Sequence, residues 1–286
     1  MEQVNTAFDF PAYIADEDKT LHFLYGTTFG RMLLQPMCTQ AFSKMVGSFM
    51  DSGASVRLIP HFIKKYAIPM DDYIPCQYLS FNDFFARKIK AESRPIDNVK
   101  THLIAPCDSK VTVYPITEDA IFFIKDVPYS IKSLLRSHSL ANRYIGGYCY
   151  IFRLSVDDYH RYCYPDNGCR TRYVRIPGRL HTVNPMVLEH ADIYRENTRE
   201  YAVLRTENFG DLLMMQVGAM LVGKISNEDT RRFSRGEEAG HFEYGGSTVV
   251  LLTPPGAAFP HPLLLERSKD SIESLVRMGE CVGTAP

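Results

Sequence analysis

From about residue 100 onward, short segments rich in β-branched and aromatic residues set the strongest limit on the fold. Stretches such as YCYIFRLSV, EYAVLRT and STVVLLT are typical of buried strands. Turn pairs such as Asn167-Gly168 and Pro177-Gly178 separate them. The segment AIFFIKDV predicts one more strand, and residues 130–140 predict a short helix. Together these segments predict a mainly antiparallel β domain.

Residues 18–70 have a different pattern, because apolar residues recur there at helical spacing. One apolar face, at i, i+3 and i+4 spacing, contains Phe42, Met45, Val46, Phe49 and Met50. This face either packs on the protein's own core or rests on lipid.

We therefore expect an α+β fold in two parts. Residues 1–98 form a helical N-terminal region, which can present a membrane-facing surface. Residues 99–286 form the β-rich domain that carries the chemistry.

Composition excludes several classes of protein. The 32 basic and 33 acidic side chains leave a net charge of −1, so a nucleic-acid partner is not expected. The seven cysteines contain no CxxC pair, which argues against a zinc site or a disulfide framework, and no metal is expected. No stretch approaches the roughly 20 apolar residues that span a bilayer, and the N-terminus has no signal-peptide core. Any contact with a membrane is therefore expected to be peripheral.

The peptide HFEYGGSTVVLL, residues 241–252, combines a glycine turn with an apolar strand. Gly245 and Gly246 permit backbone conformations that are closed to other residues. Ser247 follows them and can turn its hydroxyl back on the carbonyl of Gly246. This geometry suits a chain that cuts itself, although many ordinary glycine turns look similar.

Three other segments contain candidate functional groups. FNDFFARKIK, residues 81–90, predicts a short helix capped by Asn82, with Arg94-Pro95 ending it. Asp108 lies at a turn entering a strand, where it either caps the backbone or orients a histidine. His160, in DDYHRYC, is either structural or a proton carrier near neutral pH.

Taken together, these segments resemble the pyruvoyl-dependent phosphatidylserine decarboxylase family, in its compact bacterial form. The motifs occur in the family's order and at family-like spacing: FNDFFARK, RPID, the Asp108 element, DYHR, GRLHTVNP, ENTRE, VGAMLVG and RGEEAGHFEYGGSTVVLL. The resemblance extends from about residue 18 to the MGE near the C-terminus.

The resemblance implies that the chain cleaves itself between Gly246 and Ser247. Ser247 would attack the Gly246 carbonyl and end as a covalent pyruvoyl group, so the cofactor is pyruvate derived from Ser247. The products would be a β subunit, residues 1–246, and an α subunit, residues 247–286 (286 − 246 = 40 residues). By the same resemblance, Asp108 and His160 activate the serine hydroxyl, and Gly245 and Thr248 support the turn.

The chain departs from the family pattern at three positions. Cys163 stands where the family has a second histidine, and Ser109 follows Asp108 where glycine is usual. His181 replaces a common aromatic residue. His160 must therefore serve both self-cleavage and decarboxylation, or Cys163 must substitute, or one step is slow. His181 is either a rescuing base or a simple replacement of an aromatic ring.

The resemblance also implies a substrate and a location. The substrate would be phosphatidylserine, converted to phosphatidylethanolamine and CO2 by a homodimeric enzyme at the cytoplasmic side of a membrane surface. Two alternatives remain: a pyruvoyl-dependent decarboxylase of a soluble amino acid, and a poorly maturing lipid-binding homologue. A pyridoxal-phosphate enzyme is disfavoured, because no convincing lysine or phosphate-binding motif occurs in the sequence.

Overall fold

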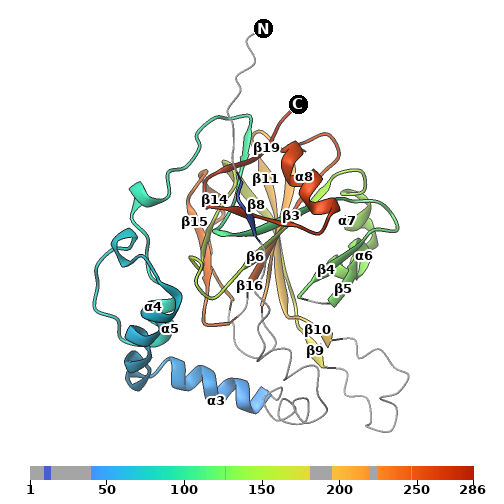
Figure 1. The fold of residues 1–286 in the computed structure, drawn as a ribbon. Helices are drawn as coiled ribbons and strands as arrows, with labels where there is room; N and C mark the ends of the chain where they lie inside the picture. Colours follow the sequence, from blue (N-terminus) through green and yellow to red (C-terminus); the bar gives the residue numbers. More distant parts are fainter. Residues whose placement is uncertain (1–9, 14–39, 126, 181–194, 219–224, 246) are drawn as a thin grey trace.

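The computed structural model describes residues 10–13, 40–125, 127–180, 195–218, 225–245 and 247–286. Within these residues the fold is α+β, as expected, and its centre is a nine-stranded antiparallel sheet (Figure 1). In spatial order the strands are β1 (Ala12–Tyr13), β18 (Glu273–Val276), β3 (Ser109–Pro115), β6 (Tyr148–Leu154), β16 (Ser247–Thr253), β12 (Asp211–Val217), β11 (Arg199–Thr206), β8 (Gly168–Ile176) and β14 (Arg232–Phe233).

Strand β16 is the middle strand of this sheet, between β6 and β12. All of its residues are buried, because both faces of the sheet are covered. Val249 and Leu251 pack into the core on one face, and Val250 and Leu252 pack into the core on the other. A strand buried on both faces reads as a continuous apolar run, which explains the sequence VVLL. As predicted, Ser247 is the first residue of a late strand.

Smaller elements cover the two faces of the large sheet. Around one core lie α8 (Pro262–Lys269) and two three-stranded sheets, and around the other lie a hairpin and two short helices. The first sheet contains β17 (Phe259–Pro260), β19 (Cys281–Thr284) and β2 (His102–Ile104), and the second contains β13 (Ile225–Asn227), β15 (Glu238–Phe242) and β7 (Arg161–Cys163). The remaining elements are the hairpin of β4 (Ile121–Ile124) and β5 (Val127–Ser130), α6 (Ile131–Leu135), α7 (His138–Asn142), β9 (Arg179–Leu180) and β10 (Arg195–Glu196).

Two local predictions were wrong for the same physical reason. The segment AIFFIKDV is a hairpin rather than one strand, because Lys125 adopts a φ of 54° and the chain reverses there. The predicted helix over residues 130–140 is two short helices, α6 and α7, because Arg136 adopts a φ of 47° between them. A residue in the left-handed region ends a helix or strand. Neither position has the glycine that usually marks such a turn.

The helical N-terminal region lies on the side of the sheet away from α6 and α7 (Figure 1). It contains α3 (Gln40–Met50), η1 (Gly53–Leu58), α4 (Ile59–Tyr66), η2 (Met70–Asp72), α5 (Phe81–Phe85) and η3 (Ala91–Ser93). Its aromatic core includes Phe62, Phe81 and Phe85 and is completed by Tyr159 and Tyr244 from the β domain. The helical region therefore packs beside the residues around His160 and the glycine turn. The division at residues 98 and 99 stays a prediction.

The predicted apolar stripe is divided between core and surface. Met50 packs against the aromatic core, whereas the Met45 and Phe49 side chains are 61% and 46% exposed. The side chain of Phe42 lies outside the described residues. Among the described residues, no helix is both long and apolar enough to cross a bilayer.

Candidate active site

The glycine turn places Ser247 at the buried end of the central strand. Gly245 has a φ of 148°, which a residue with a side chain rarely adopts. The Ser247 hydroxyl donates a hydrogen bond to the Gly245 carbonyl at 3.2 Å, and the residue is 1% exposed. On either side, β6 and β12 hold the start of the strand, through Leu154 opposite Ser247 and Val217 opposite Thr248. The Ser247 hydroxyl is thus fixed by the sheet and folded back along its own chain.

Helix α5 connects this turn with His160. Its Phe85 ring lies 5.3 Å from the Tyr244 ring and 3.9 Å from the His160 ring, measured between centroids. The Asn82 side-chain oxygen accepts a hydrogen bond from the Tyr244 backbone N–H at 3.0 Å. Asn82 is therefore not the helix cap that the sequence predicts. Ser80 caps the helix instead, by accepting from the Asp83 N–H.

His160 is neutral and keeps one ring nitrogen available. Its Nδ1 lies 2.9 Å from the Asp158 carbonyl oxygen, which can only accept, so Nδ1 carries the proton. Nε2 is then a proton acceptor, and among the described residues this buried atom has no hydrogen-bond partner. Complete burial lowers the pKa of His160 from 6.5 to about 3. A neutral imidazole with an unused lone pair is the form that a general base requires.

Asp108 is fixed by a different set of groups. Arg94 grips its carboxylate, with Nε 2.8 Å from Oδ1 and Nη2 2.6 Å from Oδ2, and the Met278 N–H donates to Oδ1 at 2.9 Å. Arg94-Pro95 therefore does not end α5, which stops at Phe85; Arg94 orients the predicted acid instead. Among the described residues, neither Asp108 nor His160 is hydrogen-bonded to Ser247. The predicted Asp–His–Ser relay stays a prediction.

Cys163 lies on β7 close to Asp108. Its backbone N–H donates to the Pro106 carbonyl at 2.8 Å, and the side chain is buried. Burial, with a smaller contribution from the Asp108 charge, raises the pKa of the Cys163 thiol to about 12. A thiol of this kind stays protonated at neutral pH and cannot accept a proton as histidine does.

Sequence reasoning missed three charged residues near His160. Lys110 is buried and pairs with Asp158, with Nζ 2.8 Å from Oδ2. The backbone carbonyl of the same Asp158 fixes the tautomer of His160. Arg87 is also buried; it donates to the Tyr73 hydroxyl at 3.0 Å, and its positive charge is one of the causes that lower the His160 pKa. The motifs FFARK and DDYH contain Arg87 and Asp158, but spacing alone gave them no role.

Two predicted site residues, Gly246 and His181, lie outside the described residues. Among the remaining candidates, Thr248 is buried beside Ser247 on β16, and Ser109 is the first residue of β3. The structure thus gathers the glycine turn and His160 around α5, and it places Asp108 beside Cys163.

Comparison with known proteins identifies the family of this chain. The family model for phosphatidylserine decarboxylase matches residues 81–284. A "phosphatidylserine decarboxylase proenzyme 2" of Clostridium acetobutylicum is 45% identical over 92% of this chain and 91% of its own length. Proteins named "phosphatidylserine decarboxylase proenzyme" from Clostridium kluyveri and Clostridium botulinum are 37% and 36% identical, each over 93% of this chain and 92% of their own length. The chain therefore belongs to the phosphatidylserine decarboxylase family.

Proposed function

We propose that this chain is a carboxy-lyase that converts phosphatidylserine to phosphatidylethanolamine and CO2, after cleaving itself between Gly246 and Ser247. The observation that carries the proposal is the buried Ser247 hydroxyl, folded 3.2 Å from the carbonyl oxygen of Gly245 at the start of the central strand. Family membership and the names of the relatives support the same activity.

Self-cleavage begins with the Ser247 hydroxyl. Its oxygen attacks the carbonyl carbon of Gly246 while His160 accepts the hydroxyl proton at Nε2, and the proton passes to the departing amine. The C–N bond breaks and an ester replaces the amide. Loss of the Ser247 Cα proton then eliminates the ester, leaving a free carboxylate on Gly246 and a dehydroalanine at residue 247. Water replaces the nitrogen of that residue, and ammonia leaves.

The surroundings of Ser247 suit the group that results. A pyruvoyl group supplies carbonyls that accept the electron pair left behind when CO2 departs. The site is buried, which strengthens such electrostatic stabilisation. His160 Nε2 is an acceptor with no hydrogen-bond partner among the described residues, so it can take up a proton transiently, and Asp108 is held in place by Arg94.

The high pKa of the Cys163 thiol favours one interpretation of why this chain has cysteine where the family has a second histidine. Because this thiol stays protonated, His160 serves both self-cleavage and decarboxylation, and the shared use slows one of them. Cys163→His restores the second imidazole and should accelerate the slow step. Unchanged rates of both steps would show that the second histidine is dispensable in this chain.

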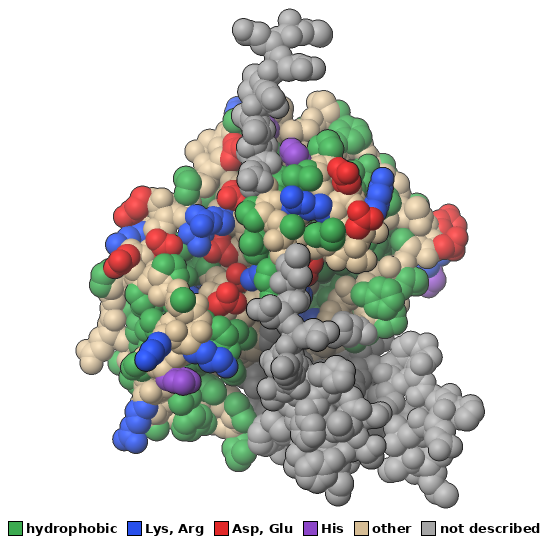
Figure 2. Space-filling view, in the orientation of Figure 1, with side chains coloured by type: hydrophobic (Ala, Val, Ile, Leu, Met, Phe, Trp, Pro, Cys, Tyr) green, Lys and Arg blue, Asp and Glu red, His purple; other side chains and the backbone are tan. Residues whose placement is uncertain are grey.

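A peripheral membrane surface fits the helical region. Exposed Met45, Phe49 and Leu58 belong to the same helical region as the exposed basic residues Arg57 and Lys64. Figure 2 shows hydrophobic side chains interspersed with Lys and Arg over this part of the molecule. Apolar and basic groups together favour binding to anionic lipid such as phosphatidylserine. The cytoplasmic side of the membrane and a homodimer rest on the family resemblance alone.

Intact mass spectrometry tests the self-cleavage. The purified chain should give fragments of 246 and 40 residues, with the small one lighter by one ammonia than a hydrolysed serine end. Ser247→Ala should remain one chain, whereas Ser139→Ala, at an exposed serine on α7, should mature normally. A full-length chain after long incubation would refute the proposed maturation.

A vesicle assay tests the substrate and the membrane surface. CO2 should be released from phosphatidylserine vesicles, and Phe49→Asp should weaken flotation with them. The matched control is Phe123→Asp, at a residue that is 68% exposed on β4. Release of CO2 only from free serine, without flotation, would favour the soluble amino-acid decarboxylase.

A further inference from the structure

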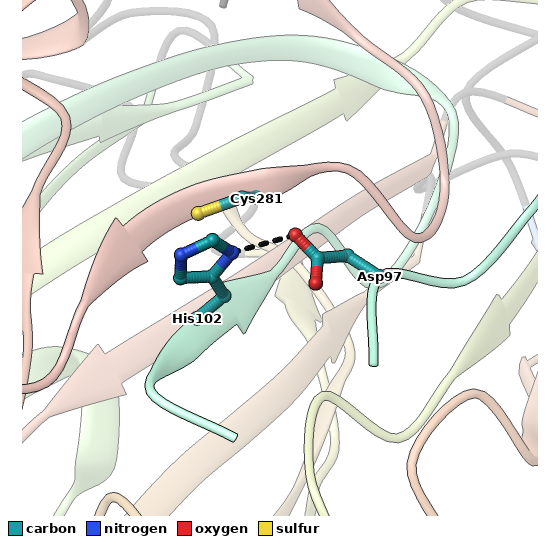
Figure 3. A group of neighbouring side chains, drawn as sticks. All are labelled: Asp97, His102 and Cys281. Carbon is teal, nitrogen blue, oxygen red and sulfur yellow. Dashed lines mark hydrogen bonds and ion pairs between the residues drawn. The ribbon is translucent and has the colours of Figure 1, made fainter. Parts of the chain in front are cut away.

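Asp97, His102 and Cys281, none of which belongs to the site described above, lie together (Figure 3). His102 begins β2 and Cys281 begins β19, two strands that pair with each other, and Asp97 precedes them in a loop. His102 Nδ1 lies 2.7 Å from Asp97 Oδ2. One donor atom of each residue lies within 4.8 Å of the other two. A carboxylate, an imidazole and a sulfur therefore converge on one point.

The loop that carries two of these groups is fixed from several directions. The Val99 N–H donates to Asp97 Oδ1 at 2.8 Å, which leaves Oδ2 turned toward His102. The Asp97 N–H donates to the Gly279 carbonyl at 3.0 Å. The Arg235 guanidinium donates to the His102 carbonyl at 2.7 Å and to the Asp97 carbonyl at 3.2 Å. Such backbone and outer hydrogen bonds orient the donor atoms in advance, as in established metal sites.

Accessibility and charge also fit a cation. The Asp97 and His102 side chains are 20% and 22% exposed, so an ion can enter from solvent, while Cys281 is buried behind them. The nearby Arg235 cation is balanced by Asp166, whose Oδ1 lies 3.2 Å from Nη2. A divalent ion would then be neutralised by the Asp97 carboxylate and the Cys281 thiolate.

We propose that Asp97, His102 and Cys281 bind Zn²⁺ or a similar borderline divalent cation, with water as the fourth ligand. The nitrogen, oxygen and sulfur donors suit zinc better than Mg²⁺ or Ca²⁺, which prefer oxygen ligands. Zinc bonds of about 2.0–2.3 Å place tetrahedral ligands about 3.5 Å apart, so the side chains need to move by only about 1 Å.

Binding requires one proton to leave. The Cys281 thiol now donates to the Gly283 carbonyl, at an S···O distance of 3.3 Å, and this hydrogen bond must be given up when the sulfur binds a cation. A coordinating cation displaces the thiol proton, so affinity should increase with pH. If the chain is cleaved after Gly246, which rests on the proposed function, the ion would also join the two products. Cys281 would belong to the small fragment, and the other two ligands to the large one.

The test uses the full-length chain with Ser247→Ala in parallel, so that the result is independent of self-cleavage. After chelator treatment, Zn²⁺ is titrated in competition with a chromogenic chelator. We expect one zinc ion per chain. The affinity for Zn²⁺ should fall about 10-fold or more in Cys281→Ser and in His102→Ala. Cys76→Ser and His61→Ala, at exposed residues outside the cluster, should leave the affinity unchanged.

Cobalt provides a second measurement that does not depend on the folding of any variant. Co²⁺ bound to the unaltered cluster should give a thiolate-to-metal charge-transfer band, which is lost in Cys281→Ser. Absence of this band in the unaltered chain would overturn the proposal. Equal zinc affinity in the unaltered chain and in all the variants would likewise overturn it, since the metal would then be an adventitious ion only.

Discussion

The burial of His160 predicts a specific dependence of stability on pH. The unfolded chain takes up a proton on this histidine below its ordinary pKa of 6.5, whereas the folded chain does so only near 3. The contribution of the neutral imidazole to stability is therefore complete above pH 6.5 and is lost as pH falls toward 3. The difference between the two pKa values (6.5 − 3 = 3.5) corresponds to a total change of about 5 kcal/mol in the free energy of unfolding. At about pH 5 the loss is about 2 kcal/mol.

Urea unfolding of the Ser247→Ala chain, with and without His160→Gln, measures this loss. Between about pH 7.5 and pH 5, the free energy of unfolding should fall by about 2 kcal/mol more in the chain that keeps His160 than in the His160→Gln variant. The reason is that the glutamine amide is neutral at every pH. Other groups, such as Asp158, titrate in both chains, so the comparison isolates the histidine. His61→Gln, at an exposed histidine, serves as the control. Equal pH slopes with and without His160 would refute its burial as a neutral base.

The same pKa has a consequence for maturation. A histidine with a pKa near 6.5 loses about 90% of its neutral form between neutrality and pH 5.5, which would slow a base-catalysed step about tenfold. With a pKa of about 3, His160 stays neutral throughout that range. The rate of self-cleavage, followed by gel densitometry, should therefore show no titration near pH 6.5. A tenfold fall in the rate of self-cleavage with a midpoint near pH 6.5 would contradict the low pKa of His160.

Three further perturbations test other parts of the site. Cys163→Ser should change the self-cleavage rate less than about twofold, because a thiol with a pKa of about 12 takes no part in proton transfer. A tenfold lower rate of self-cleavage on the gel would show that the thiol does take part. Arg94→Met should slow self-cleavage about tenfold or more by releasing Asp108. Arg143→Met, which breaks an exposed ion pair, should leave the rate of self-cleavage unchanged. Equal rates of self-cleavage in the two variants would exclude a role of Arg94 in orienting Asp108. Leu251→Ala should lower the free energy of unfolding by about 2–5 kcal/mol in a urea titration, because it opens a cavity in the core beside the central strand. A loss below about 1 kcal/mol would show that the sheet relaxes to fill this cavity.

The sequence by itself determined the elements whose signals are local. Period-two and continuous apolar runs identified β6, β11 and β16, because a strand shows its burial in its own residues. The two glycines before Ser247 indicated the turn, because Gly245 must adopt a φ that favours glycine. Family motifs identified the remaining candidates, although no local property distinguished His160 from a structural histidine.

Only the tertiary structure decided which groups meet, because their partners are far apart in the chain. Asp108 is held by Arg94 and by the backbone of Met278, and His160 packs against Phe85. The Lys125 and Arg136 turns were invisible for another reason: packing imposes a left-handed backbone that these residue types do not signal. The cluster of Asp97, His102 and Cys281 has no spacing motif at all, since the pairing of β2 with β19 brings together residues that are 184 positions apart at the extremes (281 − 97).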